Sequence, residues 1–163
     1  MSITNVDYYI IHNREIKIDK QIKQKKIINR PNCLLFMIGF DLKYKYPYDY
    51  YDKFIYHIKF KKNIFRDLYQ KKRNNTHILI IDCKRGDIDD LLEKYGNNNN
   101  NKNNNLDWLL LIENYSGIYF KNYDNQLKYN KFKWYRYIEF DKGYIWNKAS
   151  IRNVDKVIDP NEY

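Results

Sequence analysis

The feature that most constrains the fold is the shortness of the apolar segments. The longest, residues 33–40, is a run of eight that includes one glycine, far short of the ~18 residues that a membrane-spanning helix needs. A run of this length suits a strand buried on both faces, and residues 77–83 are a second run of the same kind. The sequence therefore predicts a soluble domain built on buried strands, with no helix that crosses a bilayer.

Other strands are predicted by apolar residues that alternate with polar ones. Alternation indicates strands at residues 8–18 and 54–60, each with one buried face. Residues 132–140 alternate as well, and the turn at residues 141–143 leads into residues 144–146. This last pattern predicts a β-hairpin near the C-terminus.

Three short helices are predicted by their capping residues. The clearest is residues 87–96, where Asp87 stands at the start, acids fill the first turn and Gly96 ends the segment. Asp107 caps a second helix, and Asn63 begins a third that carries Leu68 on its apolar face. The acids of the first helix already have a structural use, so they are not assigned to catalysis.

These elements predict an α+β fold with small mixed or antiparallel sheets, about three short helices and a C-terminal β-hairpin. A length of 163 residues fits one domain that spans residues 1–163. Residues 97–105 are nearly all asparagine and have no apolar side chain to bury. We expect them to form a flexible loop inserted within that domain.

The positive charge of the chain is concentrated in its first half. Residues 1–75 hold 17 Lys and Arg against 7 Asp and Glu, while residues 76–163 hold 13 of each. Base composition explains the preference for Lys, Ile, Asn and Tyr, whose codons are poor in G and C, but not this asymmetry. Basic clusters attract polyanions, although a solvated lysine surface that keeps the protein soluble is the alternative. The predicted anion-binding or nucleic-acid-binding residues are Lys23, Lys25, Lys26, Arg30, Lys61, Lys62 and Arg66.

No sequence pattern predicts a metal site. Cys33 and Cys83 are far apart, lie within apolar segments and have no CxxC spacing, which indicates buried small residues in a reducing compartment. The common phosphate-binding, metalloprotease and hydrolase motifs are absent from the sequence. Any site centred on His12, His57 or His77 would have to be assembled by the fold.

Three blocks carry a family resemblance. Residues 134–146 (WYRYIEFDKGYIW) resemble a W-Y-Y-x-W-D-x-x-S-G-C-I-W segment of uncharacterised small proteins from phages and giant DNA viruses of amoebae. Residues 107–119 and 29–37 are similar to the two blocks that precede it in that family. The resemblance implies a viral protein located in the host cytoplasm or the virion, and not a secreted one.

That family is similar in layout to ADP-ribosyltransferase-like domains, which hold NAD in a cleft between two small sheets. The resemblance implies His12 as an NAD-holding residue and Glu139 as the carboxylate that stabilises the positive charge on the sugar. The chain departs from the family at the positions of Cys33, Met37 and Lys142, where the family has small or hydroxyl side chains. Leu35 likewise replaces an aromatic residue.

These departures favour a catalytically degraded family member, a viral accessory protein that acts by binding and uses no cofactor. The first alternative is an ADP-ribosyltransferase-like enzyme that uses NAD through His12 and Glu139. The second is a nucleic-acid-binding module that uses the basic N-terminal half. The sequence indicates no membrane partner.

Overall fold

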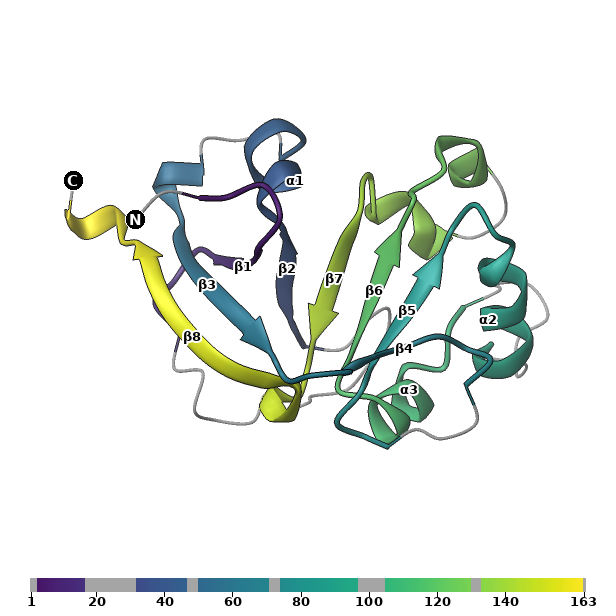
Figure 1. Ribbon diagram of the computed structural model, residues 1–163. Helices are drawn as coiled ribbons and strands as arrows, with labels where there is room; N and C mark the ends of the chain where they lie inside the picture. Colours follow the sequence, from purple (N-terminus) through teal and green to yellow (C-terminus); the bar gives the residue numbers. More distant parts are fainter. Residues whose placement is uncertain are drawn as a thin grey trace.

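The strands found in the described residues all belong to one sheet. The computed structural model describes residues 3–16, 32–46, 50–70, 74–96, 105–129 and 133–162, and in them eight strands pair in the order β4-β5-β6-β7-β2-β1-β3-β8 (Figure 1). Three α-helices and five short 3-10 helices connect them. The strands are β1 (Tyr8–His12), β2 (Leu34–Ile38), β3 (Phe54–Phe60), β4 (Phe65–Arg66), β5 (Ile78–Asp82), β6 (Gly117–Lys121), β7 (Lys142–Ile145) and β8 (Ile151–Ile158). The helices are α1 (Gly39–Tyr44), α2 (Asp87–Tyr95), α3 (Trp108–Asn114), η1 (Tyr50–Asp52), η2 (Asn125–Tyr129), η3 (Lys133–Tyr137), η4 (Lys148–Ser150) and η5 (Pro160–Glu162).

The sheet is mixed, which confirms the predicted α+β class. Strands β4, β5 and β6 are parallel, and every other neighbouring pair is antiparallel. Figure 1 shows that the sheet bends between β2 and β7, so that β1, β2, β3 and β8 form one half and β4 to β7 the other. The chain passes from β3 to β4 across the two halves. The two small sheets implied by the ADP-ribosyltransferase resemblance are not found, because β2 and β7 are paired in one continuous sheet.

Aromatic rings fill the inner face of the bend and hold the two halves together. Phe36 on β2 stacks on Tyr119 of β6 with ring centroids 5.5 Å apart, and Phe60 on β3 meets Phe65 of β4 at 5.3 Å. Tyr8 on β1 contacts all four of these rings at 5.2 to 5.9 Å. Such ring pairs add stability beyond their buried area. The angle between the halves is therefore set by packing as well as by the β2–β7 hydrogen bonds.

A glycine makes this packing possible. A Cβ atom at Gly143 on β7 would lie 2.2 Å from Cζ of Phe36 and 2.9 Å from the Ile118 carbonyl oxygen. Any larger residue would displace Phe36 from the inner cluster. Gly143, which the sequence analysis placed in a turn, is thus a packing position at the boundary of the halves.

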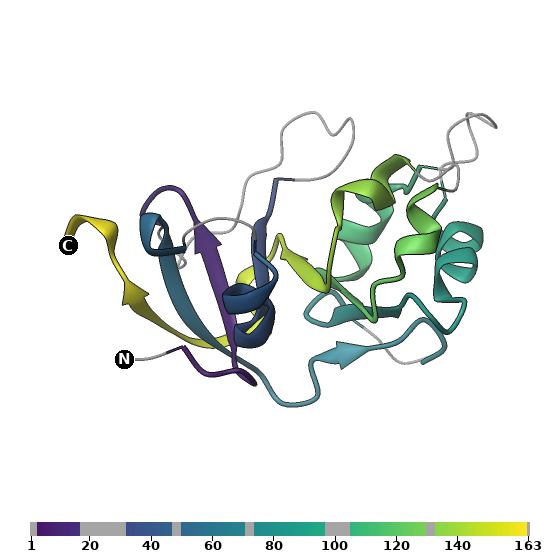
Figure 2. The ribbon, with the colours of Figure 1, turned by 90° about the horizontal axis from the view of Figure 1, so that it is seen from above.

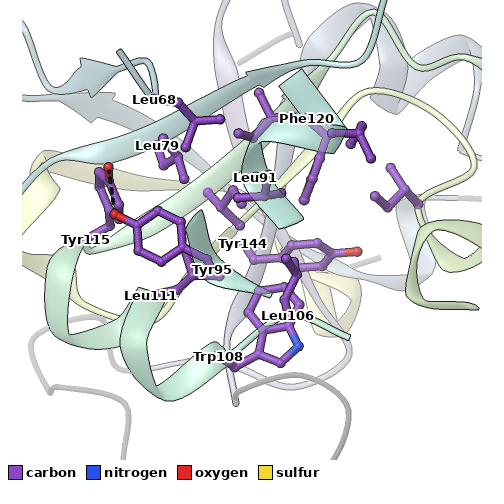
Figure 3. Close-up of a cluster of buried hydrophobic side chains, with 14 of the residues drawn as sticks. Leu68, Leu79, Leu91, Tyr95, Leu106, Trp108, Leu111, Tyr115, Phe120 and Tyr144 are labelled. Carbon is purple, nitrogen blue, oxygen red and sulfur yellow. Dashed lines mark hydrogen bonds between the residues drawn. The ribbon is translucent and has the colours of Figure 1, made fainter. Parts of the chain in front are cut away.

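Helices α2 and α3 cover the outer face of β5, β6 and β7. Figure 3 shows Leu91 of α2 and Leu111 of α3 among the buried side chains on this face. Trp146 is also buried there and meets Trp108 edge to face, with ring centroids 6.4 Å apart. Its Nε1 donates to the Tyr115 carbonyl at 2.6 Å, so this large side chain is both packed and hydrogen-bonded.

The locally specified elements agree with the sequence predictions. Strand β3 has the predicted bounds, and α3 begins where expected, with the Asp107 carboxylate accepting from the Leu110 N–H at 3.2 Å. Helix α2 also forms, but its cap is Gly86, whose φ is +88°. Only glycine adopts this φ without strain. Gly96 and Leu106 pair as an antiparallel bridge, which joins the two ends of the Asn-rich segment.

The predicted C-terminal hairpin is wrong. Residues 133–137 form the 3-10 helix η3, and β7 pairs with β2 and β6 instead of the segment before it. Tyr135, Ile138 and Phe140 are buried in this segment, and Glu139 has a left-handed φ of +67°. Because residues 133–137 are helical, the alternation of apolar residues at 132–140 does not produce a strand.

Two other predictions also fail locally. The helix expected from Asn63 to residues 71–73 is not formed in the described residues 63–70, because Asn63 turns the chain with a φ of +54° and β4 follows. Residues 71–73 lie outside the described residues. The run at residues 33–40 was predicted to be one strand, but β2 ends at Ile38 and α1 begins at Gly39. A Cβ at Gly39 would lie 1.6 Å from the Thr4 carbonyl oxygen, so the N-terminal segment can pass there only because this residue is glycine.

Candidate functional site

The two predicted catalytic residues lie at opposite ends of β7. His12 ends β1 level with Leu34, which pairs with Ile145 at the last residue of β7. Glu139 is exposed and lies before β7 begins. His12 Nδ1 accepts from the Arg14 backbone N–H at 3.1 Å, a local contact that leaves it turned to its own loop. The fold does not assemble the NAD site implied by the resemblance.

The predicted basic residues have three different outcomes. Lys23, Lys25, Lys26 and Arg30 lie outside the described residues. Lys61 and Lys62 are exposed in the turn between β3 and β4. Arg66 is half-buried, and its Nη1 donates to the carbonyl oxygens of Asn63 and Phe65. Arg66 therefore stabilises the turn that presents the two lysines.

The fold adds two cations from the second half of the chain to these lysines. The Lys61 N–H donates to the Ser150 carbonyl at 2.9 Å, and Phe60 pairs with Ile151 across the β3–β8 ladder. This brings η4 and the start of β8 beside the end of β3, at the lower end of the sheet in Figure 1. We call the resulting group the basic surface; its exposed members are Lys59, Lys61, Lys62, Lys148 and Arg152.

The cations of the basic surface are not neutralised. Within the residue ranges that the structure describes, none of the five forms an ion pair. The segments that supply them, residues 59–62 and 148–152, contain no acidic residue. Like charges that lie close together repel, and a bound polyanion relieves that repulsion. The arrangement can therefore bind phosphate groups by charge.

His77 lies beside this region, and the positive charge of Arg66 acts on its imidazole. Burial first, and the charge of Arg66 second, lower the pKa of His77. The imidazole is thereby kept neutral at physiological pH, and it adds no charge to the basic surface.

Sequence reasoning missed Lys148 and Arg152 because they belong to the half of the chain that is neutral overall. No local pattern marks them, since their partners on β3 are about ninety residues earlier in the sequence. Only the β3–β8 register could have revealed the grouping.

A pair of carboxylates at the boundary of the two halves was also missed. Asp41, in the first turn of α1, is only 3% exposed. Burial first, and the charge of Asp141 second, raise the pKa of Asp41 to about 6, while Lys45 at 3.8 Å acts in the opposite direction. Asp141 accepts from the N–H groups of Asn122 and Tyr123 at 3.0 and 2.7 Å. Asp141 therefore anchors a loop, and Asp41 is a proton-binding group that bears on stability.

The acids of α2 have the structural use that the sequence indicated. Asp87 is fully buried and accepts from Arg85 Nε at 2.9 Å and Nη2 at 2.7 Å, and from the Asp82 N–H at 2.9 Å. Burial alone would raise the pKa of Asp87, but these hydrogen bonds outweigh it and lower the pKa. Asp87 is thus a satisfied ion-pair partner and not a general base.

Cys83 is not placed to act as a reactive thiolate, and the described residues hold no cluster of metal ligands. Cys83 is buried, and that burial raises the pKa of its thiol to about 12, far above the range of a reactive thiolate. Across the described part of the chain, no group of three or more His, Cys, Asp or Glu side chains is placed to hold a metal ion. The helices in these same ranges are all too short or too polar to cross a membrane.

Comparisons with known proteins add no relative. A scan against protein-family models, a search of curated proteins and a search of solved structures each found no match.

Proposed function

We propose that this protein acts by binding, and that it binds nucleic acid through the basic surface without reading its sequence. The observation that carries the proposal is the set of five exposed cations, drawn from β3, the β3–β4 turn, η4 and β8, none of which is paired with an acid in the described residues. Phosphate contacts of this kind supply most of the affinity of non-specific nucleic-acid binding.

The alternative use of the lysines, solubility, fits this surface less well. A surface that only maintains solubility intersperses both signs of charge. Here residues 59–62 and 148–152 carry one sign only. Clustering of like charge costs stability, and a phosphate ligand offsets that cost.

The positions of the two candidate catalytic residues also favour a binding function over catalysis. His12 and Glu139 are separated by the length of β7, and the positions expected to carry small or hydroxyl groups hold residues such as the fully buried Met37. An accessory protein that binds, as the family resemblance implied, is therefore our proposal in preference to an NAD-dependent enzyme.

Fluorescence anisotropy with a labelled 20-base-pair DNA duplex tests the proposal. If about five phosphates are contacted, the affinity should fall by about 500-fold between 50 and 200 mM salt and should not depend on base sequence. Replacement of one cation, as in Lys61→Glu or Arg152→Glu, should weaken binding by about tenfold at 0.1 M salt and reduce the salt slope by about one.

Lys84 supplies a matched control, since it is exposed after the other end of β5. Lys84→Glu makes the same change in net charge and should leave the affinity within about twofold of the wild type, because screening weakens distant charges. If Lys84→Glu and Lys61→Glu weaken binding equally, net charge and not the basic surface accounts for the affinity. Binding that survives high salt contradicts the proposal.

A further inference from the structure

Helix α1 presents two aromatic rings to solvent at the upper end of the sheet in Figure 1. Phe40 is 42% exposed and Tyr44 is 67% exposed, and their ring centroids are 5.1 Å apart. The opposite side of the same helix is buried through Asp41 and Leu42. The helix is therefore held to the sheet by that buried side, and the two rings lie outside the buried core.

A third apolar side chain extends this patch. The Phe40 N–H donates to the Asn5 carbonyl at 3.1 Å, which holds the N-terminal segment alongside α1. Val6, the next residue, is 81% exposed. Figure 2 shows the segment before β1 passing close to α1. The α1 patch thus consists of Val6, Phe40 and Tyr44.

Cations border the α1 patch. The Nζ of Lys43 lies 5.9 Å from the centroid of the Tyr44 ring and donates to the Ile3 carbonyl at 2.9 Å. The Lys45 side chain, half exposed directly after α1, lies 3.8 Å from the Asp41 carboxylate. The acid of this helix, Asp41, is buried and directed away from solvent. Exposed rings next to cations are the combination that binds single-stranded nucleic acid, because bases stack on the rings while phosphates lie by the charges.

We propose that the α1 patch is a stacking site for the bases of single-stranded nucleic acid, a specificity that rests on the proposed function of the basic surface. A duplex cannot use the rings, since its base faces are already stacked on one another. The patch has only three side chains, whereas a stable protein partner needs about 800 Å² on each side. The charges of Lys43 and Lys45 complement a polyanion along α1, while the acid Asp7, whose side chain is 45% exposed, lies on the Val6 side of the patch.

The test compares a labelled mixed-sequence 20-nucleotide single strand with its duplex. The double variant Phe40→Leu/Tyr44→Leu keeps the patch apolar and removes both rings. It should lose at least about tenfold in affinity for the single strand, since stacking contributes strongly at each base, and should bind the duplex as the wild type does. The ring-preserving variant Phe40→Tyr/Tyr44→Phe should restore single-strand affinity.

Exposed Leu109 and Leu110 on α3 supply the control. Leu109→Ala/Leu110→Ala removes apolar surface elsewhere and should leave both affinities unchanged. Tyr44→Leu alone, at the more exposed ring, should show a smaller loss of single-strand binding even if the double variant is unstable.

Two outcomes separate this inference from the proposed function. If the wild type binds neither probe, both proposals fail. If it binds both probes in a salt-dependent way and the ring variants change nothing, the stacking site is overturned and the basic surface stands. A concentration-dependent dimer in light scattering that disappears in Phe40→Leu/Tyr44→Leu would identify the patch as a self-association surface, and would overturn the stacking site.

Discussion

The two halves of the bent sheet use similar strands for different purposes. The half under α2 and α3 holds the largest buried cluster, which includes Trp108, Leu111 and Trp146. The other half, covered by α1, carries the exposed ring pair, the buried Asp41 and most of the basic surface. Buried apolar area is the main source of folding free energy. The comparison indicates that the half under α2 and α3 contributes the larger buried cluster, while the other half carries the exposed rings and most of the exposed cations.

The comparison is tested most directly at the centre of the half covered by α2 and α3. Trp146→Ala removes a large, fully buried side chain and leaves the Tyr115 carbonyl without its donor. We expect a loss of about 3 to 5 kcal/mol in the free energy of unfolding, measured by urea denaturation. Tyr44→Ala, at the exposed ring of the other half, should cost less than about 0.5 kcal/mol. Equal losses of unfolding free energy at the two sites would contradict the idea that the half covered by α2 and α3 contributes more to stability.

A second test addresses the buried carboxyl at the boundary between the halves. The pKa of Asp41 is raised from 3.8 to about 6 in the folded state. The folded protein therefore holds this proton more tightly than the unfolded chain does. Its stabilising effect is full below pH 4 and is lost as the pH rises to 6, a change of about 2 to 3 kcal/mol.

Asp41→Asn should accordingly make the protein more stable than the wild type at pH 7, with the advantage shrinking toward pH 4. The measurement is the free energy of unfolding in urea at several pH values. Asp155→Asn, made on an exposed residue of β8, is the matched control. An advantage for Asp41→Asn that is constant from pH 4 to pH 7 would show that titration of Asp41 is not its cause.

The parts of the fold that the sequence predicted are the parts specified locally. Strand β3 follows from alternation, and the start of α3 follows from the Asp107 cap. Sheet order could not be predicted in the same way, since β2 pairs with a strand more than one hundred residues later in the chain. The hairpin failed for the same reason, because the long-range partners of β7 displaced its neighbour in sequence.

The candidate sites show the same limit. Lys61 and Lys62 could be chosen from their local cluster, but Lys148 and Arg152 join them only through the β3–β8 ladder. Phe40 was assigned to a buried strand, and it is exposed because the chain turns into α1 at Gly39. Charge density is a local property of sequence, whereas exposure is a property of the fold.

The smallest expected effect concerns the connection between α2 and α3. The Gly96–Leu106 bridge and a 2.6 Å hydrogen bond from the Asp107 N–H to the Tyr95 carbonyl hold the ends of this connection together. We expect replacement of residues 97–105 with a short Gly-Ser linker to change only the closure entropy of this connection, which depends weakly on length. We expect the free energy of unfolding to change by less than about 1 kcal/mol. A larger loss of unfolding free energy in urea denaturation would mean that the asparagines stabilise the half covered by α2 and α3. We attribute the stability of that half to its apolar cluster alone.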